Sequence, residues 1–576
     1  MELNMNFNEI KTRNELADFL GIKRSTLSYV LYKKKTENYY ISFEIAKKSG
    51  GKRKIDAPVG TLKSIQKKLA DKLYRYQEKI RAENKIIPKV SNAFEKGKNI
   101  ITNAEIHRNK RFVLNIDLKD FFHSFHFGRV RGFFLKNKYF QLTDEVSTVL
   151  AQLSCFEGRL PQGAATSPIL ANMIFQIVDM RILKIAKRYH CDYTRYADDL
   201  TFSTNEKNFA ENYIDLFNTL KKEIERSGFS INEDKTNLMY KDSRQVVTGL
   251  VVNEKVSIIH TYYRKARSMA NHLYKTGEFY IDGNKGSLKQ LEGIFSFINQ
   301  IDNHNKYAEL KLKNQYNRSK QLFRNLNGRE KQYQLFLFYK YFYANETPLI
   351  ITEGKTDIRY IKAALKSLYS NFPGLILKNQ TDDFEFKISF LHRTKRLQYF
   401  FGIDIDGADT NTDFIENFLH KKKQEGLPDH YSDLEKWSGN PPKNPVIFIY
   451  DNELNSSEKT PIKNLITRTG VDKEVLKENG YVKICRNVFV VIIPLVSNKE
   501  VCEIEDLFLE ETLKTSIDGR TFEKKVKKGD KDHYSKDVFS KYVYRNYKNI
   551  NFNNFDKLLN ILQTVINEYG KCSEPH

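Results

Sequence analysis

The chain has 576 residues, with 95 Lys and Arg against 71 Asp and Glu, which gives a formal net charge of +24. At roughly 150 residues per domain this length predicts several domains, and the positive charge favours a polyanionic partner such as nucleic acid. The five Cys form no CxxC pair, which argues against a disulfide framework or a structural zinc site. The sequence shows neither an apolar leader nor a long apolar run, so we expect a cytoplasmic protein without a membrane partner.

The first 40 residues form the first predicted segment. Apolar residues recur at helical spacing on both sides of Gly21, which predicts two short helices. Such a pair resembles a helix-turn-helix, but apolar spacing indicates only that the helices pack and does not indicate that they bind DNA. We therefore assign residues 1–40 to an N-terminal helical segment.

Strands and helices alternate from Ile41 to Val252, which predicts an α/β domain. The predicted elements are a hairpin over 39–58 that turns at Ser49–Gly51, a helix over 61–80, and strands over 111–118 and 244–252.

Residues 253–345 change to long helical patterns. The stretch from His304 to Tyr343 has nine Lys and Arg against two Glu, with aromatic residues between them. These aromatic residues are Tyr307, Tyr316, Phe323, Tyr333, Phe336, Phe338 and Tyr339. A basic, aromatic helical element suits a clamp on nucleic acid, and a solvated helix face is the alternative.

The pattern resets at Thr347, where an apolar strand, an acidic turn and an amphipathic helix begin a second α/β domain over 346–515. Further strands are predicted at 444–451 and 487–495, and the polar stretch 407–445 is predicted to be a loop. We assign 516–576 to a basic C-terminal extension, because Lys514 to Lys548 has eleven Lys and Arg against five Asp and Glu.

Three carboxylates define the first candidate site. An apolar strand ends in Asp117, and Asp198 and Asp199 lie in the turn of a predicted hairpin. Carboxylates that converge from neighbouring strands repel one another unless cations lie between them, and Mg²⁺ prefers such oxygen ligands. Two such ions support phosphoryl transfer, whereas an isolated Asp-Asp pair is also typical of an exposed turn.

The motifs around these carboxylates resemble those of reverse transcriptases. "DLKDFF", "LPQGAATSP", "YADD" and "GFSINEDKTNL" resemble the palm motifs in order and spacing, and "GKRKIDAP", "LKSIQKKL" and "SNAFEKGKNI" resemble the fingers motifs. The resemblance implies a right-hand fold with fingers and palm over 41–252 and a helical, RNA-binding thumb over 253–345. It also implies an RNA-directed DNA polymerase that uses deoxynucleoside triphosphates.

The same resemblance implies roles for single residues. Asp117, Asp198 and Asp199 would hold two Mg²⁺ ions, and Asp120 would be structural. Lys235 would either protonate the leaving pyrophosphate or contact phosphate. The implied nucleotide and template contacts are Arg53, Phe122 (which would exclude a ribose 2′-OH), Gln162, Gly163 and Tyr196.

Two short strings resemble the signatures of retron reverse transcriptases: "NAEIH" (Asn103 to His107) and "VTG" (Val247 to Gly249). The likeness implies synthesis of msDNA, a branched RNA–DNA molecule, from a cognate noncoding RNA. It assigns recognition of that RNA to the thumb and to Asn103, His107, Val247, Thr248 and Gly249. A reverse transcriptase of another class, such as an intron or other defence enzyme, is the alternative.

A second set of acids lies in the second α/β domain. "IITEGKTD" places Glu353 at the end of a strand, and "NPVIFIYDNELN" places Asp451 and Glu453 at the end of another. Such acids on adjacent strand ends would also bind Mg²⁺. The motifs resemble the Toprim domain of topoisomerases, primases and OLD-type nucleases, which implies metal-dependent cleavage.

Several further acids accompany this resemblance. Glu505 in "EIEDLF" is a candidate third ligand or the start of an acidic helix, and Asp357 either caps a helix or assists the metal. Asp404 and Asp406 in "DIDG" are rivals of Asp451 and Glu453.

Together the two resemblances imply a multidomain α/β protein in which a retron reverse transcriptase precedes a Toprim effector of antiphage defence. Its partners would be the noncoding RNA, the msDNA and a nucleic-acid target of the effector. Because "DNE" at Asp451–Glu453 departs from the usual D-x-D, a catalytically inactive Toprim scaffold stays open, as does a homo-oligomer.

Overall fold

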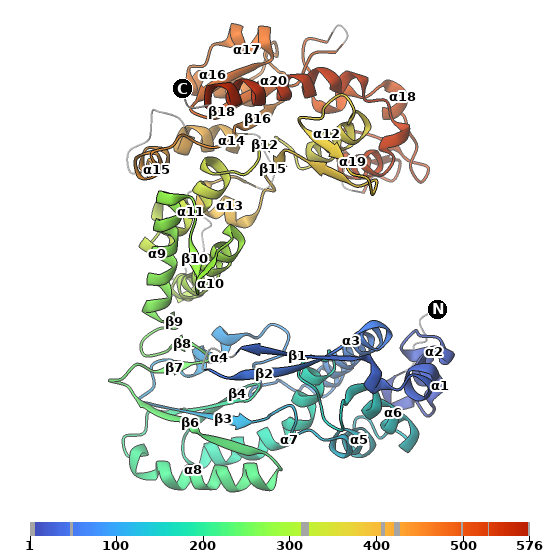
Figure 1. The fold of residues 1–576 in the computed structure, drawn as a ribbon, viewed down its shortest axis with the longest axis vertical. Coiled ribbons are helices and arrows are strands. Elements are labelled where there is room, and N and C mark those ends of the chain that lie inside the picture. Colours follow the sequence, from blue (N-terminus) through green and yellow to red (C-terminus); the bar gives the residue numbers. More distant parts are fainter. Residues whose placement is uncertain are drawn as a thin grey trace. The chain divides into compact units, whose positions relative to one another are not determined.

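The computed structural model describes residues 6–46, 50–312, 322–404, 409–419, 427–496, 499–527 and 529–573. The chain forms two compact units, Met1–His260 and Thr261–His576, and each is described by itself (Figure 1).

An antiparallel four-stranded sheet lies at the centre of the first unit, with the strand order β4-β5-β3-β6. The strands are β3 (Phe112–Lys119), β4 (Asp192–Tyr196), β5 (Asp199–Thr204) and β6 (Ser230–Tyr240). Two helices, α7 (Ser167–Arg188) and α8 (Phe209–Arg226), pack on each other and against this sheet (Figure 1). Their apolar faces are buried at helical spacing, as at Leu216, Leu220 and Ile224.

Five further helices contribute buried residues to the same hydrophobic core: α1 (Arg13–Phe19), α2 (Arg24–Ser28), α3 (Gly60–Glu83), α5 (Phe127–Lys136) and α6 (Asp144–Ser154). The first unit also contains β1 (Tyr40–Ala46), β2 (Lys52–Pro58) and α4 (Ile100–Ile106). The predicted hairpin is present as the antiparallel pair β1–β2, and Ser49 in its turn lies outside the described residues. Leu16 and Leu27 of the N-terminal helices are buried in one cluster with Leu69 of α3 and Phe134 of α5.

The single strand predicted over 244–252 is wrong. The structure has β7 (Val246–Val247) and β8 (Leu250–Val251) as an antiparallel pair, and β9 (Ser257–Ile258) pairs with β8. Thr248 and Gly249 form the turn with φ of 45° and 82°. Positive φ at both turn residues is typical of two-residue hairpins, so the glycine marked a turn within an otherwise strand-like run.

A five-stranded sheet organises the second unit, with the strand order β15-β12-β16-β18-β17. The strands are β12 (Leu349–Ile351), β15 (Ser389–Phe390), β16 (Val446–Tyr450), β17 (Tyr481–Cys485) and β18 (Val488–Ile492). The first four strands in this order are parallel, and β17 runs antiparallel. Every residue of β12, β16 and β18 is buried, as expected for parallel strands covered on both faces.

The helices predicted as a thumb share a core with this sheet. They are α9 (His260–Thr276), α10 (Leu288–Leu312), α11 (Gly328–Phe338) and the short helix η5 (Tyr339–Tyr343). Phe336 and Phe342 belong to one buried cluster with Phe448 of β16 and Val490 of β18.

This shared core corrects the expected role of the aromatic residues between His304 and Tyr343. Those with described side chains, namely Phe323, Tyr333, Phe336, Phe338 and Tyr339, are buried. They therefore stabilise the core and do not form a stacking surface for bases. The side chains of Tyr307 and Tyr316 lie outside the described residues.

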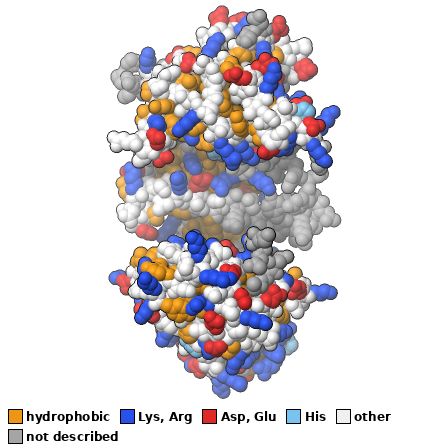
Figure 2. Space-filling view, turned by 90° about the vertical axis from the view of Figure 1, so that its right-hand side faces the viewer, with side chains coloured by type: hydrophobic (Ala, Val, Ile, Leu, Met, Phe, Trp, Pro, Cys, Tyr) orange, Lys and Arg blue, Asp and Glu red, His pale blue; other side chains and the backbone are white. Residues whose placement is uncertain are grey.

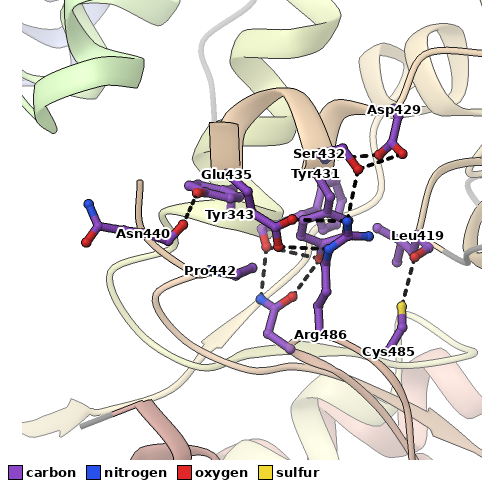
Figure 3. A network of polar contacts seen from close by, with 12 residues as sticks. Tyr343, Leu419, Asp429, Tyr431, Ser432, Glu435, Asn440, Pro442, Cys485 and Arg486 are labelled. Atoms are coloured by element: carbon purple, nitrogen blue, oxygen red, sulfur yellow. Dashed lines mark hydrogen bonds and ion pairs between the residues drawn. The ribbon is translucent and has the colours of Figure 1, made fainter. Parts of the chain in front are cut away.

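The loop predicted over 407–445 is also wrong, because much of it is helical. The described elements there are α14 (Asp409–Phe414), η6 (Ile415–Leu419) and α15 (His430–Ser438). Polar contacts bind α15 to the turn between β17 and β18 (Figure 3): Arg486 Nε donates to Glu435 at 2.8 Å, and its Nη2 donates to Ser432 Oγ at 3.1 Å. The hydroxyls of Tyr343 in η5 and Ser438 in α15 lie 2.6 Å apart. The spacing of Phe414, Ile415 and Phe418, all buried, was the helical signal within this polar stretch.

The residues after 515 complete the core on the other side of the sheet. They include α19 (Lys536–Arg545) and α20 (Asp556–Ser573). Phe539 and Leu559 share a buried cluster with Ile350 of β12 and Ile447 of β16. A boundary at 515 would cut through this cluster, so the basic tail is an integral part of the second unit.

Positive side chains are spread over the face of the molecule that Figure 2 shows. Figure 2 shows Lys and Arg side chains across the face in view, which carries α12 (Asp357–Ser367) and α19, with Asp and Glu between them. Within the described part of the chain, no helix combines the length and the apolar composition needed to cross a membrane.

Candidate active sites

The three acids predicted for the first site converge at one end of the palm sheet. Asp117 near the end of β3 pairs with Asp199 at the start of β5, and Asp198 lies in the turn between β4 and β5. The N–H of Leu118 donates to the carbonyl of Asp198 at 3.0 Å, which holds the turn against β3. Residues 81 positions apart in the sequence thus form one cluster of carboxylates.

Neighbouring Lys and Arg side chains balance the negative charge of these carboxylates only in part. The pKa of Asp199 is raised to about 7, mainly by desolvation and also by the negative charges of Asp198 and Asp117. Desolvation likewise raises the pKa of Asp198. Lys235 Nζ lies 3.1 Å from Asp117 Oδ1, a contact that the sequence did not predict. A set of carboxylate oxygens with raised pKa fits divalent cations.

A buried ion pair supports the turn that carries Asp198. Arg195 on β4 is fully buried, and its Nε and Nη2 donate to Asp179 of α7 at 2.9 and 2.8 Å. Its Nη1 donates to the carbonyl of Ala197 at 3.2 Å, and Ala197 has a φ of 57°. A non-glycine residue with positive φ is strained, so this hydrogen bond stabilises the turn. The signal missed in the sequence was a charged residue within a strand that is otherwise buried.

Among the residues predicted to contact nucleotide and template, Arg53 lies on the fingers hairpin, and Gln162 and Gly163 lie against that hairpin. The N–H of Asp56 on β2 donates to the carbonyl of Gln162 at 2.8 Å. A Cβ on Gly163 would lie 2.8 Å from the carbonyl oxygen of Asp56, so only glycine fits there without displacement. Arg53 is exposed on β2, and its charge partly offsets the rise in the pKa of Asp198 that desolvation causes.

Two aromatic residues complete this set. Phe122 is half-buried, with its ring centre 6.2 Å from that of Phe94. Tyr196 is half-buried and pairs with Asp199 across the hairpin. Both therefore keep part of their surface exposed.

The two retron-like strings lie side by side. The hydroxyl of Thr248 donates to the carbonyl of Ile100 at the start of α4, at 3.4 Å. Asn103, His107 and Val247 are fully buried, which corrects the expectation that they contact RNA directly. Of the five residues, only Thr248 and Gly249 reach the surface.

His107 instead forms contacts with two strands of the palm sheet. Its Nδ1 and Nε2 each lie 2.7 Å from a hydroxyl, of Ser203 on β5 and Thr194 on β4. Burial lowers the pKa of His107 to about 3, so this imidazole is neutral at pH 7.

The second site lies at the carboxyl ends of two neighbouring parallel strands. Glu353 follows β12 and Asp451 follows β16, and the N–H of Asp451 donates to Glu353 Oε1 at 3.2 Å. Asn452 forms two backbone hydrogen bonds with Cys502, at 2.8 and 3.0 Å. This bridge brings the segment that contains Glu505 to the same edge of the sheet.

Burial and like charge destabilise the ionised forms of these acids. Burial raises the pKa of both Glu353 and Asp451, and the charges of neighbouring carboxylates raise them further. Burial also raises the pKa of Asp357 to about 6, although its Oδ2 accepts a hydrogen bond from the N–H of Gly354 at 2.8 Å. The pKa of Glu453 is raised as well, by partial burial and by Glu503.

Glu505 provides a separate indication of a cation. Its side chain is 1% exposed, and Oε1 has no hydrogen-bond partner among the described residues. Lys536 Nζ lies 3.1 Å from Oε2 of Glu505 and 3.0 Å from Glu503. A buried carboxylate oxygen without a partner is costly, so these oxygens fit a metal ligand set.

The rival acids of the "DIDG" string are placed differently. The carboxylate of Asp404 accepts a hydrogen bond from Gln398 Nε2 at 2.6 Å, and Asp406 lies outside the described residues. In the described part of the chain, Glu523, Asp530 and His533 also bring potential ligand atoms within 4.8 Å of one another. His533 Nδ1 lies 3.0 Å from Asp530, so these groups already satisfy one another.

Comparisons with known proteins agree with the palm geometry. Residues 45–268 match the model of the family described as "Reverse transcriptase (RNA-dependent DNA polymerase)". The chain is 33% identical to the Retron Mx162 reverse transcriptase of Myxococcus xanthus, over 51% of this chain and 64% of the relative. It is also 33% identical to the Retron Ec73 reverse transcriptase of Escherichia coli, over 46% of this chain and 83% of the relative.

Among solved structures, a telomerase from Candida albicans in complex with a fragment of telomeric RNA matches 51% of this chain and 58% of its own. The TM-score is 0.30 and the identity 11%. The sequence matches carry the assignment, since the chain covers most of Retron Ec73 reverse transcriptase at 33% identity. The chain therefore belongs to the family of retron reverse transcriptases.

Proposed function

We propose that the first unit is the catalytic part of an RNA-directed DNA polymerase that copies a cognate noncoding RNA into branched msDNA. The observation that supports this most is the pairing of Asp117 with Asp199 beside Asp198 in the hairpin turn. Mg²⁺ bound by these carboxylates would activate a 3′-hydroxyl and stabilise the leaving pyrophosphate.

The chain's own residues position the substrates. Gly163 lets the backbone of residues 162–163 approach the fingers hairpin, where Arg53 offers a positive charge to a triphosphate. Phe122, five residues after Asp117 in the chain, would exclude a ribose 2′-OH, and Lys235 would hold Asp117 in place until phosphate arrives. The Arg195–Asp179 pair keeps the Asp198 turn rigid during each cycle.

Purified protein incubated with RNA, primer, deoxynucleoside triphosphates and Mg²⁺ tests the polymerase activity. We expect DNA synthesis from the wild type and none from Asp198→Asn. Asp120→Asn is the matched control, since it changes a carboxylate of the same motif that we assign no metal.

For the second unit we propose a Toprim-type nuclease that acts as the effector of an antiphage defence system. The supporting observation is the hydrogen bond between Asp451 and Glu353 at adjacent parallel strand ends. Glu453 lies two residues after Asp451, and the Asn452–Cys502 bridge brings the segment that contains Glu505 to the same edge of the sheet. In this reaction water adds to a phosphodiester phosphorus, and the bond to the leaving sugar oxygen breaks as that oxygen takes a proton. Mg²⁺ held by these acids would supply the charge neutralisation.

A catalytically inactive scaffold is the second candidate for this unit. It is favoured by Glu453, which stands where a shorter acid is usual and is only partly buried. Incubation of the purified protein with labelled RNA and DNA separates the two: cleavage that is lost in Glu353→Gln supports the nuclease, and absence of cleavage of either substrate supports the scaffold.

A further inference from the structure

A basic cavity of about 400 Å³ lies beside the second acidic site. Six Lys and Arg side chains line it: Lys355, Arg359, Lys362, Arg393, Lys541 and Arg545. They come from the turn before α12, from α12 itself, from the segment before α13 (Lys395–Phe401) and from the last turns of α19. The predicted basic tail therefore contributes to this cavity through α19.

Positive charge exceeds negative charge around this cavity. No Asp or Glu is among the described residues that line it. Asp537 accepts a hydrogen bond from Arg359 Nη1 at 2.7 Å and lies 2.6 Å from Lys541 Nζ. The acids of the second site lie at the border of the cavity, so the six cations of its lining leave a field that favours phosphate inside it.

The lining also offers apolar and aromatic surface. Ile358, Leu391 and Tyr544 contribute to it beside the cations. Lys366 Nζ lies 4.4 Å from the centre of the Tyr544 ring and donates to its hydroxyl at 3.0 Å. This contact fixes the ring before any ligand binds. Cations next to a fixed aromatic side chain suit a nucleotide, which carries a phosphate and a flat base.

The cavity borders the acids directly. Thr352 and Gly354 line it, and Glu353 lies between them in the chain. Arg393, another lining residue, donates from Nη2 to the carbonyl of Thr352 at 2.7 Å. A nucleotide in the cavity would therefore place its neighbouring phosphodiester toward Glu353 and Asp451.

We propose that this cavity binds one nucleotide of a nucleic-acid strand and presents the adjacent phosphodiester to the acids of the second site. The proposal rests on the proposed nuclease function and names its substrate: a strand with at least one nucleotide beyond the cleaved bond. The phosphate lies on Lys541 and Arg545, and the base packs against Tyr544.

Cross-linking tests this binding without cleavage. Full-length Glu353→Gln protein is irradiated with single-stranded oligonucleotides that carry 4-thiouridine or 4-thiothymidine, and the linked peptides are mapped by mass spectrometry. We expect links to residues 355–362 or 541–545 that fall about tenfold in Lys541→Ala/Arg545→Ala, a loss of about 1.4 kcal/mol of binding. Lys473→Ala, which removes an exposed charge on α17 (Lys473–Asn479), should leave them unchanged. Links that avoid both segments, or that persist in the double variant, would overturn the proposal.

Competition distinguishes a strand from a free nucleotide. We expect an unlabelled oligonucleotide to suppress the cross-link at far lower concentration than adenosine 5′-monophosphate or deoxyadenosine 5′-monophosphate. Equal competition by a mononucleotide would contradict binding of a strand.

Cleavage by protein with an intact Glu353 separates this proposal from the nuclease function. If cleavage occurs and Lys541→Ala/Arg545→Ala leaves its KM unchanged, the cavity is not a substrate subsite and the nuclease function stands. If cleavage does not occur and links still map to the cavity, the nuclease function fails and strand binding stands.

Discussion

The backbone N–H of Asp451 donates a hydrogen bond to Oε1 of Glu353 at 3.2 Å, across 98 positions of sequence. Asp451 directly follows β16, Glu353 follows β12 after Thr352, and these two buried parallel strands pair with each other. Carboxyl ends of neighbouring parallel strands are the usual place for ligands in α/β sheets. This hydrogen bond therefore joins the two motifs on which the second site depends.

Replacement of Glu353 should separate the two activities. We expect Glu353→Gln to keep the fold and DNA synthesis and to lower nucleic-acid cleavage by at least about a hundredfold, because it removes a charged ligand oxygen from the site. Glu346→Gln, an exposed change just before β12, is the control. Parallel assays of synthesis and cleavage check this, and equal cleavage by both variants would refute the role of Glu353.

Loss of Arg195 should destabilise the first unit. Removal of one partner of a buried ion pair costs about 3–5 kcal/mol, because Asp179 is left buried and uncompensated. We expect Arg195→Ala to lower the free energy of unfolding by this amount in urea titrations and to abolish DNA synthesis. The exposed Arg188→Ala should stay within about 0.5 kcal/mol of the wild type. A similar result for both variants would show that the pair does not support the turn.

The buried His107 should make stability depend on pH. Burial lowers its pKa to about 3, whereas a His in the unfolded chain has a pKa of about 6.5. Below about pH 6.5 the unfolded chain therefore binds a proton that the native chain does not, and stability falls by about 1.4 kcal/mol per pH unit as the pH drops toward 3.

Urea titrations between pH 7 and pH 5 measure this slope. His107→Gln should reduce it by one proton, and His123→Gln, which leaves His107 in place, is the control. An unchanged slope in His107→Gln would mean that this imidazole accepts a proton in the folded state.

A methyl group at residue 163 should disturb nucleotide binding. Gly163 has a φ of 130°, and a Cβ there would lie 2.8 Å from the carbonyl oxygen of Asp56. We expect Gly163→Ala to raise the KM for deoxynucleoside triphosphates by about tenfold or more, a cost of about 1.4 kcal/mol, as the fingers hairpin is pushed away. Gly132→Ala lies in a helix with open space around the new methyl group and should leave this KM unchanged. Steady-state kinetics of both variants measure the KM for deoxynucleoside triphosphates.

The clustering of the acids could be predicted from the sequence because their motifs are local. Asp198 and Asp199 adjoin in the chain, and Asp117 lies near the end of an apolar strand, so strand alternation was sufficient to bring them together. The same holds for Glu353 and Asp451, each placed by the apolar strand before it.

The supporting contacts could not be predicted, because they join distant segments. Nothing near Arg195 in the sequence indicates Asp179 as its partner, and nothing near Asn452 indicates Cys502. The aromatic residues of α11 and η5 suggested nucleic-acid stacking by composition, but burial against the sheet decides their role. Composition alone does not distinguish a basic aromatic surface from a core helix.

The product that the first site makes tests the central claim most directly. Nucleic acid that co-purifies with the wild-type protein from cells with its own noncoding RNA should be an RNA–DNA molecule whose DNA is joined to an internal 2′-hydroxyl. Treatment with debranching enzyme followed by sequencing identifies that joint. The account predicts this branched molecule with the wild type and with Glu353→Gln, and its absence with Asp198→Asn. Linear DNA without attached RNA, or branched product from Asp198→Asn, would contradict it.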